Sequence, residues 1–554
     1  MFSKKNKNSM GLLKQHARQF SLIVTSALFI SGCSQLPHQQ AMQQQAAAEA
    51  AAKAKEAQEL AEADAICHTD TDTINQFAVA DYDNVWDRIR EGFALDHTSN
   101  TRIDKHRKWY ASHPRYMTRV SERAKRYMHH IVGELEARDL PMELALLPIV
   151  ESAFDPFAYS HGRASGMWQF IPGTGRMYGL KQNWWYDGRR DVVASTDAAL
   201  RYLSYLNKRF KGDWMHALAA YNTGEGNVSK AIRRNKRAGK PTDFWSLKLP
   251  RETRAYVPQL IALAQLVKEP EAYKLTLPVI PNEPYFAQID IKSQIDLAQA
   301  ASLADMDIDD LYLLNAGFNR WATDPKGPHR LLIPVDKADE FAAKLASLGK
   351  QDRVAWERYR VKSGDSLLKI AKHFNTTVAS LKDANNLRSN MIRQNQMLLI
   401  PVAAKPAKHY AYSEQQRIER KQNYSRGKSG TAKTTYRVKA GDSFWKIAKA
   451  YQVKVSDLAR WNGMAPKDPL KQGQKLVIWA KNDRINMVRS NHRKGNQVIR
   501  KVAYQVRNGD SLARIAGKFN LSVNDILRWN PIKKNNYIHP GQSLTLFVDV
   551  TRTN

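Results

Sequence analysis

The sequence predicts a multidomain chain in which a mainly α-helical domain is followed by small α+β modules. The chain has 554 residues, more than one hydrophobic core can serve, so its length suggests about three or four domains. Apolar residues recur with helical spacing over residues 76–280, and no long alternating strands interrupt them. After residue 358 one short pattern occurs three times, which indicates a repeated module.

Residues 1–33 have the features of an export signal. Basic residues precede an apolar run at Phe20–Ile30, which is too short to span a bilayer comfortably as a permanent anchor. The signal ends in Phe29-Ile-Ser-Gly-Cys33, which resembles the bacterial lipobox. This resemblance implies that Cys33 is acylated, and Ser34 after it implies the outer membrane. The alternative is an ordinary signal peptide with an accidental cysteine.

The chain is strongly basic, with 86 Lys and Arg against 53 Asp and Glu and a formal net charge of +33. Such a charge favours a polyanionic partner, but export argues against nucleic acid and leaves anionic lipid or an acidic polymer. With only 2 cysteines, Cys33 and Cys67, no disulfide framework is available. Residues 34–75 are rich in Ala and Gln and are interpreted as a helical or disordered spacer.

The middle domain shows its helical periodicity most clearly at residues 119–135 and 195–206. Asp191 and Ser195 are both suited to cap the second of these helices, because their side-chain oxygens can accept from the free N–H groups of a first turn. The sequence therefore predicts a helical domain with defined helix starts.

Glu151 lies in the largely apolar stretch Pro141–Pro156 and is the candidate general acid. Pro141 suits the first turn of the helix that leads to it, and Pro148 is expected to kink that helix just before the carboxylate. A carboxyl held beside buried apolar residues is partly desolvated, which favours its protonated form. The alternative is a solvated glutamate at a helix C-terminus.

Residues further along suit the binding of a sugar. Trp168 and Gln169 follow several small residues and offer a stacking face and an amide, which suit apolar sugar faces and N-acetyl groups. Tyr221 and Asn222 are expected at a helix end before a Gly-rich turn, and Tyr256 supplies another aromatic ring. Taken singly, each also has an interpretation as a core aromatic or a helix cap.

In this order the motifs resemble the lysozyme-like transglycosylase family over residues 120–268. The matching elements are Glu151-Ser152, the segment from Ser160 through Ala164, Gly166 and Gln169 to Pro172 and Thr174, the Ala220-Tyr221-Asn222-x-Gly224 turn, and Tyr256. The resemblance implies that Glu151 is the single catalytic acid/base and that the cleft is lined by Gln169, Tyr221, Asn222 and Tyr256. Arg163 stands where the family often has Gly, and Met167-Trp168 replaces the commoner Leu-Met.

The implied reaction cleaves the β-1,4 bond between N-acetylmuramic acid and N-acetylglucosamine in peptidoglycan and leaves a 1,6-anhydro end. Two alternatives stay open. One is a lysozyme-type hydrolase, for which Asp155 or Asp187 is the nearest second carboxylate, and the other is a non-catalytic wall-binding tether. The 15 histidines are scattered without ligand spacing, so neither a metal nor a cofactor is expected.

The repeated pattern predicts a strand, a tight turn, two helices and a second strand in each copy. This βααβ unit resembles the LysM module, a binder of N-acetylglucosamine-containing glycans, at residues 358–402, 435–479 and 503–548. The resemblance implies a glycan groove at the Gly-Asp-Ser turns, namely Gly364, Asp365 and Ser366, then Gly441, Asp442 and Ser443, and finally Gly509, Asp510 and Ser511. Peptidoglycan glycan strands are therefore the expected partner.

The remaining segments are expected to connect the domains or to have a structural role. Residues 286–335 look like a degenerate fourth copy without Gly-Asp-Ser, which suggests a structural role. Residues 403–434 and 480–502 carry many Lys and Arg and few aliphatic residues, which predicts flexible basic linkers. Residues 350–554 are accordingly expected to be needed for wall binding but not for chemistry on soluble glycan.

Overall fold

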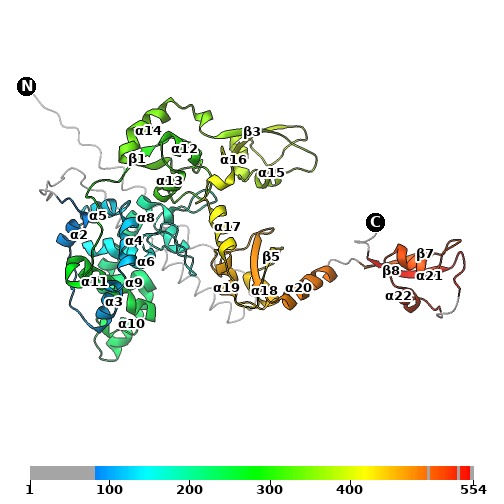
Figure 1. Cartoon of the computed structure of the whole chain (residues 1–554), viewed down its shortest axis with the longest axis horizontal. Coiled ribbons are helices and arrows are strands. Elements are labelled where there is room, and N and C mark those ends of the chain that lie inside the picture. Colours follow the sequence, from blue (N-terminus) through cyan, green and yellow to red (C-terminus); the bar gives the residue numbers. More distant parts are fainter. Residues whose placement is uncertain (1–81, 496–498, 533–536, 550–554) are drawn as a thin grey trace, which may run out of the picture. The chain divides into compact units, whose positions relative to one another are not determined.

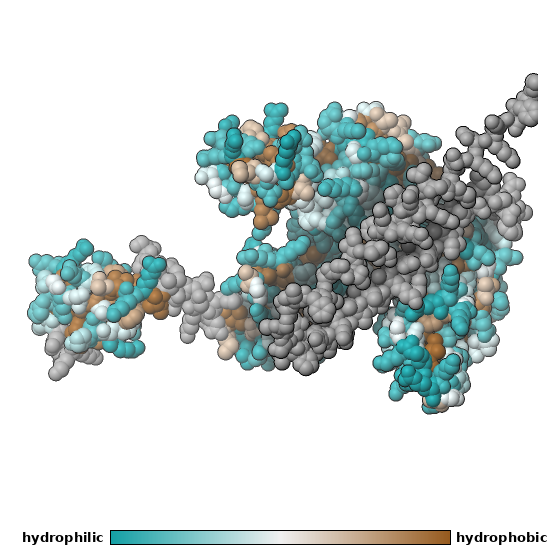
Figure 2. All heavy atoms as spheres, turned by 180° about the vertical axis from the view of Figure 1, so that it is seen from behind, coloured by the Kyte–Doolittle hydropathy of each residue, from teal (hydrophilic) through white to brown (hydrophobic). Residues whose placement is uncertain are grey.

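The computed structural model describes residues 82–495, 499–532 and 537–549, so the export signal, Cys33 and Cys67 lie outside the described residues. Figure 1 shows a helical region followed by small modules with paired strands, which confirms the predicted fold class. Within the described part of the chain, no helix is both long enough and apolar enough to cross a membrane. Hydrophilic side chains predominate among the coloured residues in Figure 2.

The helical region contains ten α-helices among its described residues, with short 3-10 turns between some of them. They are α2 (Val85–Glu91), α3 (Thr101–Ala111), α4 (Pro114–Ala124), α5 (Met128–Glu136), η1 (Met142–Leu146), α6 (Leu147–Ser152), α7 (Pro172–Met177), η2 (Gly188–Arg190), α8 (Val192–Arg209), α9 (Trp214–Thr223), α10 (Glu225–Arg237), η3 (Phe244–Ser246), α11 (Arg251–Lys268) and η4 (Glu271–Tyr273). Helix α11 packs against α3, α6 and α9 and carries several fully buried aliphatic side chains. It is the central element of this region.

Three local predictions of the sequence differ from the structure. The helix expected at 119–135 is two helices, α4 and α5, because the chain turns at Lys125–Tyr127, where the Tyr127 hydroxyl donates to the carbonyl of Leu313. Asp191 does cap α8 by accepting from the N–H of Ala194, whereas Ser195 lies inside that helix. Pro148 does not kink a continuous helix. It stands in the first turn of α6. Backbone N–H groups in a first turn have no partner within the helix, so a proline there costs no hydrogen bond.

Four modules follow, each with one antiparallel strand pair around two helices. The first has β1 (Phe286–Asp290), α12 (Leu297–Leu303), α13 (Ile308–Leu314), β2 (Arg330–Pro334) and an added α14 (Val335–Ser347); the next has β3 (Ala355–Arg360), α15 (Leu367–His373), α16 (Val378–Ala384) and β4 (Met397–Val402); then come β5 (Ala432–Arg437), α18 (Phe444–Tyr451), α19 (Val455–Trp461) and β6 (Lys475–Ala480); and last β7 (Ile499–Gln505), α21 (Leu512–Lys518), α22 (Val523–Trp529) and β8 (Ser543–Asp549).

One asparagine at the end of the second helix ties each module together. In the second module Asn385 accepts from the N–H of Leu399 and donates to the Leu399 carbonyl, at 2.7 and 2.8 Å. Asn315, Asn462 and Asn530 make the same pair of bonds to the last strand of the other three modules. An amide can satisfy a backbone donor and acceptor together. This shared pair of hydrogen bonds shows that residues 286–334 have the same architecture as the repeats.

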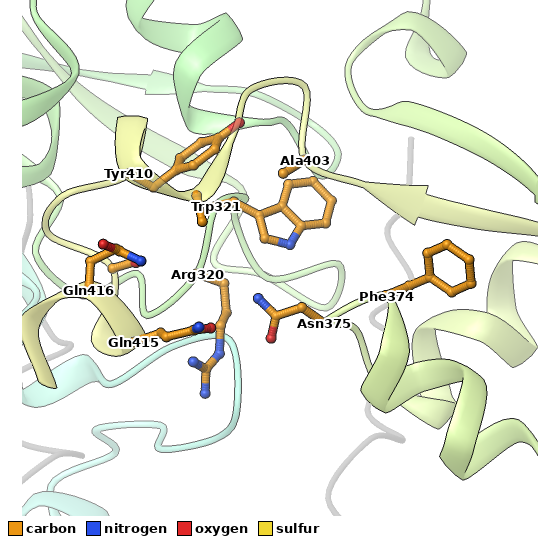
Figure 3. Close-up of a pocket in the computed structure, with 10 residues that line it drawn as sticks. Arg320, Trp321, Phe374, Asn375, Ala403, Tyr410, Gln415 and Gln416 are labelled. Carbon is orange, nitrogen blue, oxygen red and sulfur yellow. The ribbon is translucent and has the colours of Figure 1, made fainter. Parts of the chain in front are cut away.

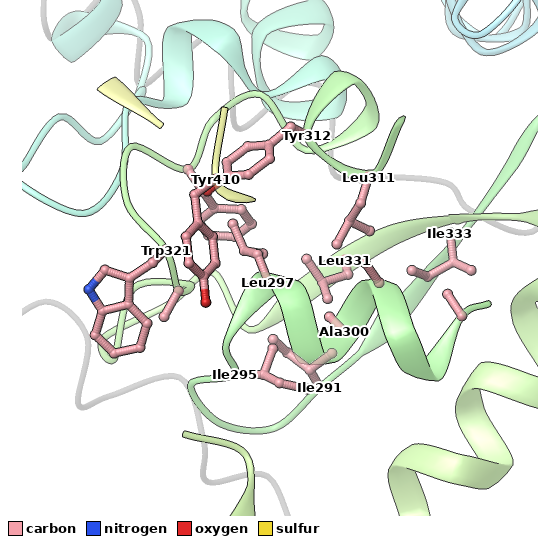
Figure 4. Close-up of a cluster of buried hydrophobic side chains, with 14 of the residues drawn as sticks. Ile291, Ile295, Leu297, Ala300, Leu311, Tyr312, Trp321, Leu331, Ile333 and Tyr410 are labelled. Atoms are coloured by element: carbon pink, nitrogen blue, oxygen red, sulfur yellow. The ribbon is translucent and has the colours of Figure 1, made fainter. Parts of the chain in front are cut away.

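The first module is joined to the helical region by a shared hydrophobic core. Trp185 and Tyr186, which precede α8, belong to the same buried cluster as Phe318 and Trp321 of the module. Figure 4 shows this cluster around Leu297 and Tyr410. The module is therefore part of one folded body with the helical region, in keeping with a structural role.

Residues 403–434 are ordered, which differs from the flexible linker that composition predicted. They form η6 (Ala407–His409) and α17 (Glu414–Tyr424). Tyr410 is only 2% exposed, and its hydroxyl donates to the buried Asp296 carboxylate. The composition of such a segment does not reveal that it is ordered, because one or two buried aromatic side chains are enough to fix it in place. Residues 480–502 also contain a helix, α20 (Asn482–Gly495), which packs Ile485 and Val488 on the third module.

We therefore expect a chain cut at residue 350 to lose stability, because the cut removes Tyr410 from the shared core. Tyr410→Ala alone should lower the free energy of unfolding by about 3 to 5 kcal/mol, the range for a buried aromatic residue. Tyr424→Ala is the matched control, since Tyr424 is 76% exposed and its loss should cost under about 0.5 kcal/mol. Calorimetry would measure both. Equal unfolding temperatures for the two variants would contradict the packing described for Tyr410.

Candidate active site

Glu151 stands near the end of the short helix α6, whose earlier residues are buried. Leu147, Pro148 and Ile149 face the core, and the chain then leaves the helix through Ala153 in a left-handed conformation. The Ser152 hydroxyl lies 3.0 Å from the carbonyl of Met167, so it joins the end of α6 to the loop that follows. The carboxylate is thereby held at one end of a rigid, apolar turn.

The carboxyl of Glu151 accepts a hydrogen bond of 2.6 Å from the Tyr256 hydroxyl on α11. Burial raises the pKa of Glu151 to about 7, the Tyr256 hydrogen bond opposes this rise, and the nearby charge of Glu252 adds to it. Desolvation is the main cause, because it penalises the charged form of a carboxyl. Near neutral pH the group is therefore poised between its acid and base forms, as a general acid/base requires.

The loop that carries Gln169 is closed by backbone pairing of Ser165 with both Tyr159 and Phe170. Gln169 itself has a left-handed backbone with φ of 51°, and its amide nitrogen donates to the carbonyl of Gly166 at 2.7 Å. The side chain is half-buried, and its amide oxygen makes no described hydrogen bond. An amide held this way retains an acceptor for a ligand.

Tyr221 and Asn222 lie on the last turn of α9, as predicted, before Gly224 with φ of 88°. The Tyr221 hydroxyl donates to the carbonyl of Trp168 at 2.8 Å, and burial, together with the nearby charge of Glu151, raises the pKa of that hydroxyl. Asn222 accepts from the hydroxyl of Thr253 at 2.8 Å. The structure thus brings these residues together with Glu151 and Tyr256.

Trp168 is the one predicted cleft residue whose expected contact is wrong. Its side chain is completely buried, and its indole N–H donates to the Thr196 hydroxyl at 3.0 Å. A ring with no exposed face cannot stack on a sugar. The backbone of Trp168 takes part in the cleft instead, because its carbonyl receives the Tyr221 hydroxyl.

Two further residues support the site. Thr253 is not singled out by the sequence, whereas Ser152 appears there only as the neighbour of Glu151 in the matching motif. Thr253 is buried and orients Asn222, while Ser152 connects α6 to the carbonyl of Met167. A helical spacing signal existed for Thr253, which lies three residues before Tyr256 and so on the same face of α11. Arg163, which replaces the glycine common in the family, has φ of 71°, a conformation that glycine adopts most easily.

The two candidates for a second carboxylate differ in their surroundings. Asp155 accepts from the N–H of Phe157 through one carboxylate oxygen, in a turn. Asp187 is buried and paired with Arg189 and Arg190. Burial alone would raise its pKa, but the charge of Arg190 and the bonds from Arg189 outweigh it and lower the pKa of the Asp187 carboxyl. Asp187 therefore has a structural role.

The Gly-Asp-Ser turns of the repeats use their polar side chains internally. Asp365 accepts from the N–H of Lys362 and from the Tyr359 hydroxyl, and Ser366 caps α15. Asp442 with Ser443 and Asp510 with Ser511 do the same in the other copies. Gly364, Gly441 and Gly509 all have positive φ, which the turn requires. Glycan contacts at these turns would have to come mainly from the backbone.

No group of three or more His, Cys, Asp and Glu suited to a metal occurs among the described residues. A cavity of about 170 Å³ lies beside Trp321, Tyr410, Gln415 and Gln416 (Figure 3). Arg320 on its wall is already paired with Glu414. Because none of the predicted cleft residues lines this cavity, it is separate from the site around Glu151.

Family models match much of the catalytic region and all four modules. The transglycosylase SLT domain model matches residues 131–244, which include Glu151, Gln169, Tyr221 and Asn222. The model described as lytic transglycosylase MltD, LysM-like domain, matches residues 285–350. The LysM domain model matches residues 359–401, 436–479 and 504–547.

The chain is also similar to individual proteins. The chain is 38% identical over 418 residues to membrane-bound lytic murein transglycosylase D of Escherichia coli (strain K12), covering 74% of this chain and 88% of the relative. It is 30% identical over 200 residues to the N-acetylmuramoyl-L-alanine amidase sle1 of Staphylococcus epidermidis, covering 36% of this chain and 54% of the relative. An inactive mutant of lytic transglycosylase Slt from Pseudomonas aeruginosa is 25% identical over 27% of this chain and 25% of that chain, with a TM-score of 0.21.

The raised pKa of Glu151 predicts that its charge costs stability. The native state holds the Glu151 proton up to about pH 7, whereas the unfolded state releases it near 4.5, so stability falls as pH rises between these values. Glu151→Gln removes this cost. The variant should therefore unfold like the parent below pH 4.5 and be more stable, on the order of 3 kcal/mol, above pH 7. Urea unfolding at pH 4.5 and pH 8 would measure it. The same gain at both pH values would contradict the prediction.

Proposed function

Because the chain belongs to the family of membrane-bound lytic murein transglycosylase D, it is a lytic transglycosylase of peptidoglycan, and we propose that Glu151 carries out both proton transfers of the reaction. The observation that carries this proposal is the carboxyl itself, half-buried beside Tyr256, with a pKa of about 7. Such a group can give a proton in one step and take one in the next near neutral pH.

In the first step protonated Glu151 donates to the oxygen of the glycosidic bond that is breaking. The bond to N-acetylglucosamine cleaves, and positive charge develops on the muramic acid ring. Asp187 is committed to its ion pairs with Arg189 and Arg190, and Asp155 is held in a turn by the N–H of Phe157. The N-acetyl group of the substrate is expected to stabilise the positive charge.

In the second step the Glu151 carboxylate accepts the proton of the muramoyl C6 hydroxyl. That oxygen closes on the anomeric carbon and forms the 1,6-anhydro ring, so no water is consumed and Glu151 regains its starting form. A lysozyme-type hydrolase would need water in place of the C6 hydroxyl. Gln169, Tyr221 and Asn222 border the same site and hold the glycan, in part through the free amide oxygen of Gln169.

The three LysM repeats hold the enzyme on the glycan strands. We further propose that acylated Cys33 anchors it in the outer membrane, facing the periplasm. The apolar run before Cys33, the small residues beside it and Ser34 after it support this location. A membrane anchor and wall-binding modules together would keep the cleft near its insoluble substrate.

Glu151→Gln should lower the rate of sacculus digestion by at least about 10²-fold, the usual contribution of a positioned acid/base. Mass spectrometry of the muropeptides released by the parent should show 1,6-anhydro ends. Asp155→Asn is the control, because its turn role predicts a folded and active enzyme. Reducing ends from the parent would establish a hydrolase, and undiminished lysis by Glu151→Gln would show that this residue is not the acid.

Tyr256→Phe should move the alkaline limb of the pH profile to higher pH. The hydrogen bond from Tyr256 lowers the pKa of Glu151, so its removal raises that pKa and keeps the acid protonated further into the alkaline range. The parent should lose activity above about pH 7, where Glu151 ionises. The measurement is kcat/KM on soluble glycan from pH 5 to pH 9, values chosen to span that limb. A shift toward lower pH would be inconsistent with the described hydrogen bond.

Cys33→Ala should release the protein from the membrane fraction, because no acyl chain could then be attached. Cys67→Ala is the matched control and should stay with the membrane. Fractionation of cells and mass spectrometry of the mature N-terminus would follow both variants. Retention of Cys33→Ala in the membrane fraction would rule out this anchor.

A further inference from the structure

We propose that Arg189 is a positioning residue that holds Gln169 in the glycan cleft by binding the two ends of its loop. The inference rests on the proposed function, because it takes Gln169 as a residue that contacts the glycan. Arg189 lies in η2, is not among the residues matched to the family motifs, and touches neither Glu151 nor Tyr256 through any described bond.

The Arg189 side chain is fixed before it meets the loop. Its Nε and Nη2 atoms donate to the two carboxylate oxygens of Asp187, at 2.9 and 2.8 Å. This two-pronged bond fixes the plane of the guanidinium group. Arg189 is 6% exposed, and the pair is shielded from water. The third nitrogen therefore has a defined position and direction.

That nitrogen, Nη1, binds the loop at both ends. It donates to the carbonyl of Arg163 at 2.7 Å and to the carbonyl of Phe170 at 3.1 Å. Gln169 lies between these two residues and directly precedes Phe170. One guanidinium group thus closes the loop that presents Gln169.

The loop needs such support because its backbone is strained and close to Arg189. Gln169 and Arg163 both have positive φ, a backbone conformation that is unfavourable for residues other than glycine. Gly166 packs directly on Arg189, since an added Cβ there would lie 1.9 Å from the Arg189 carbonyl oxygen. The loop is therefore both bonded to Arg189 and packed against it.

The pKa of Glu151 is shifted by groups other than Arg189. It is shifted by burial, by the hydrogen bond from Tyr256 and by the charge of Glu252, and Arg189 is not among the groups that act on it. Loss of the Arg189 side chain should therefore weaken glycan binding and leave the pH profile in place. A general loss of structure would alter both.

A double-mutant cycle tests the proposal with the full chain and soluble glycan from peptidoglycan. Arg189→Met should raise KM about tenfold, as expected for lost charge-assisted hydrogen bonds, with a smaller change in kcat and no shift of the alkaline limb. Gln169→Ala should raise KM as well. Because both act through one contact, Arg189→Met should add little in the Gln169→Ala background.

Arg353→Met is the matched control. Arg353 is also buried and donates to the backbone carbonyl of Ile291 in the first module, away from the cleft. Its loss should lower the unfolding temperature and leave KM unchanged. Arg189→Lys keeps the positive charge but has fewer hydrogen-bond donors, so its KM should lie between those of the parent and Arg189→Met. If Arg189→Met does not fold, Arg189→Lys replaces it in the double-mutant cycle.

The proposal fails if Arg189→Met raises KM by the same factor with and without Gln169, or if it moves the alkaline limb. It also fails if Arg189→Lys has the KM of the parent. Glu151→Gln separates this failure from failure of the proposed function. If that variant is inactive while the cycle is additive, only the role of Arg189 is wrong.

Discussion

The partial burial of one carboxyl is the constraint on which the rest of the catalytic region depends. Glu151 is charged only at a cost, so the fold must hold it beside a donor and still leave it within reach of a glycan. Helix α6 supplies the position, and Tyr256 on α11 supplies the donor, at 2.6 Å. The many buried contacts of α11 serve this arrangement, since a shift of that helix would move the hydroxyl away from the carboxyl.

The loop facing the acid is organised by polar bonds to backbone carbonyls. The Tyr221 hydroxyl holds the carbonyl of Trp168, the Ser152 hydroxyl holds that of Met167, and Arg189 holds that of Phe170. Carbonyls used in this way let the loop keep a fixed shape without regular secondary structure. The loop beside Glu151 is therefore held in place although it has no regular secondary structure.

The first module has the architecture of the repeats but packs against the helical region. It keeps the asparagine that ties the second helix to the last strand, but lacks the Gly-Asp-Ser turn of the other copies. Instead it buries Phe318 and Trp321 against residues of the helical region, and Tyr410 from a later segment completes that core. Catalytic region and scaffold are thus one folded body, and the repeats that follow carry the glycan-binding role.

The sequence by itself determined the fold class, the repeats and the family, because helical periodicity and local motifs are written in consecutive residues. It also pointed to Glu151, Tyr221, Asn222 and Tyr256, which the structure brings together. Only the tertiary structure decided which side chains are buried and which atoms form hydrogen bonds. The burial of Trp168, the anchoring of residues 403–434 by Tyr410 and the clamp of Arg189 on its loop all depend on contacts between distant segments, and no local pattern records such contacts.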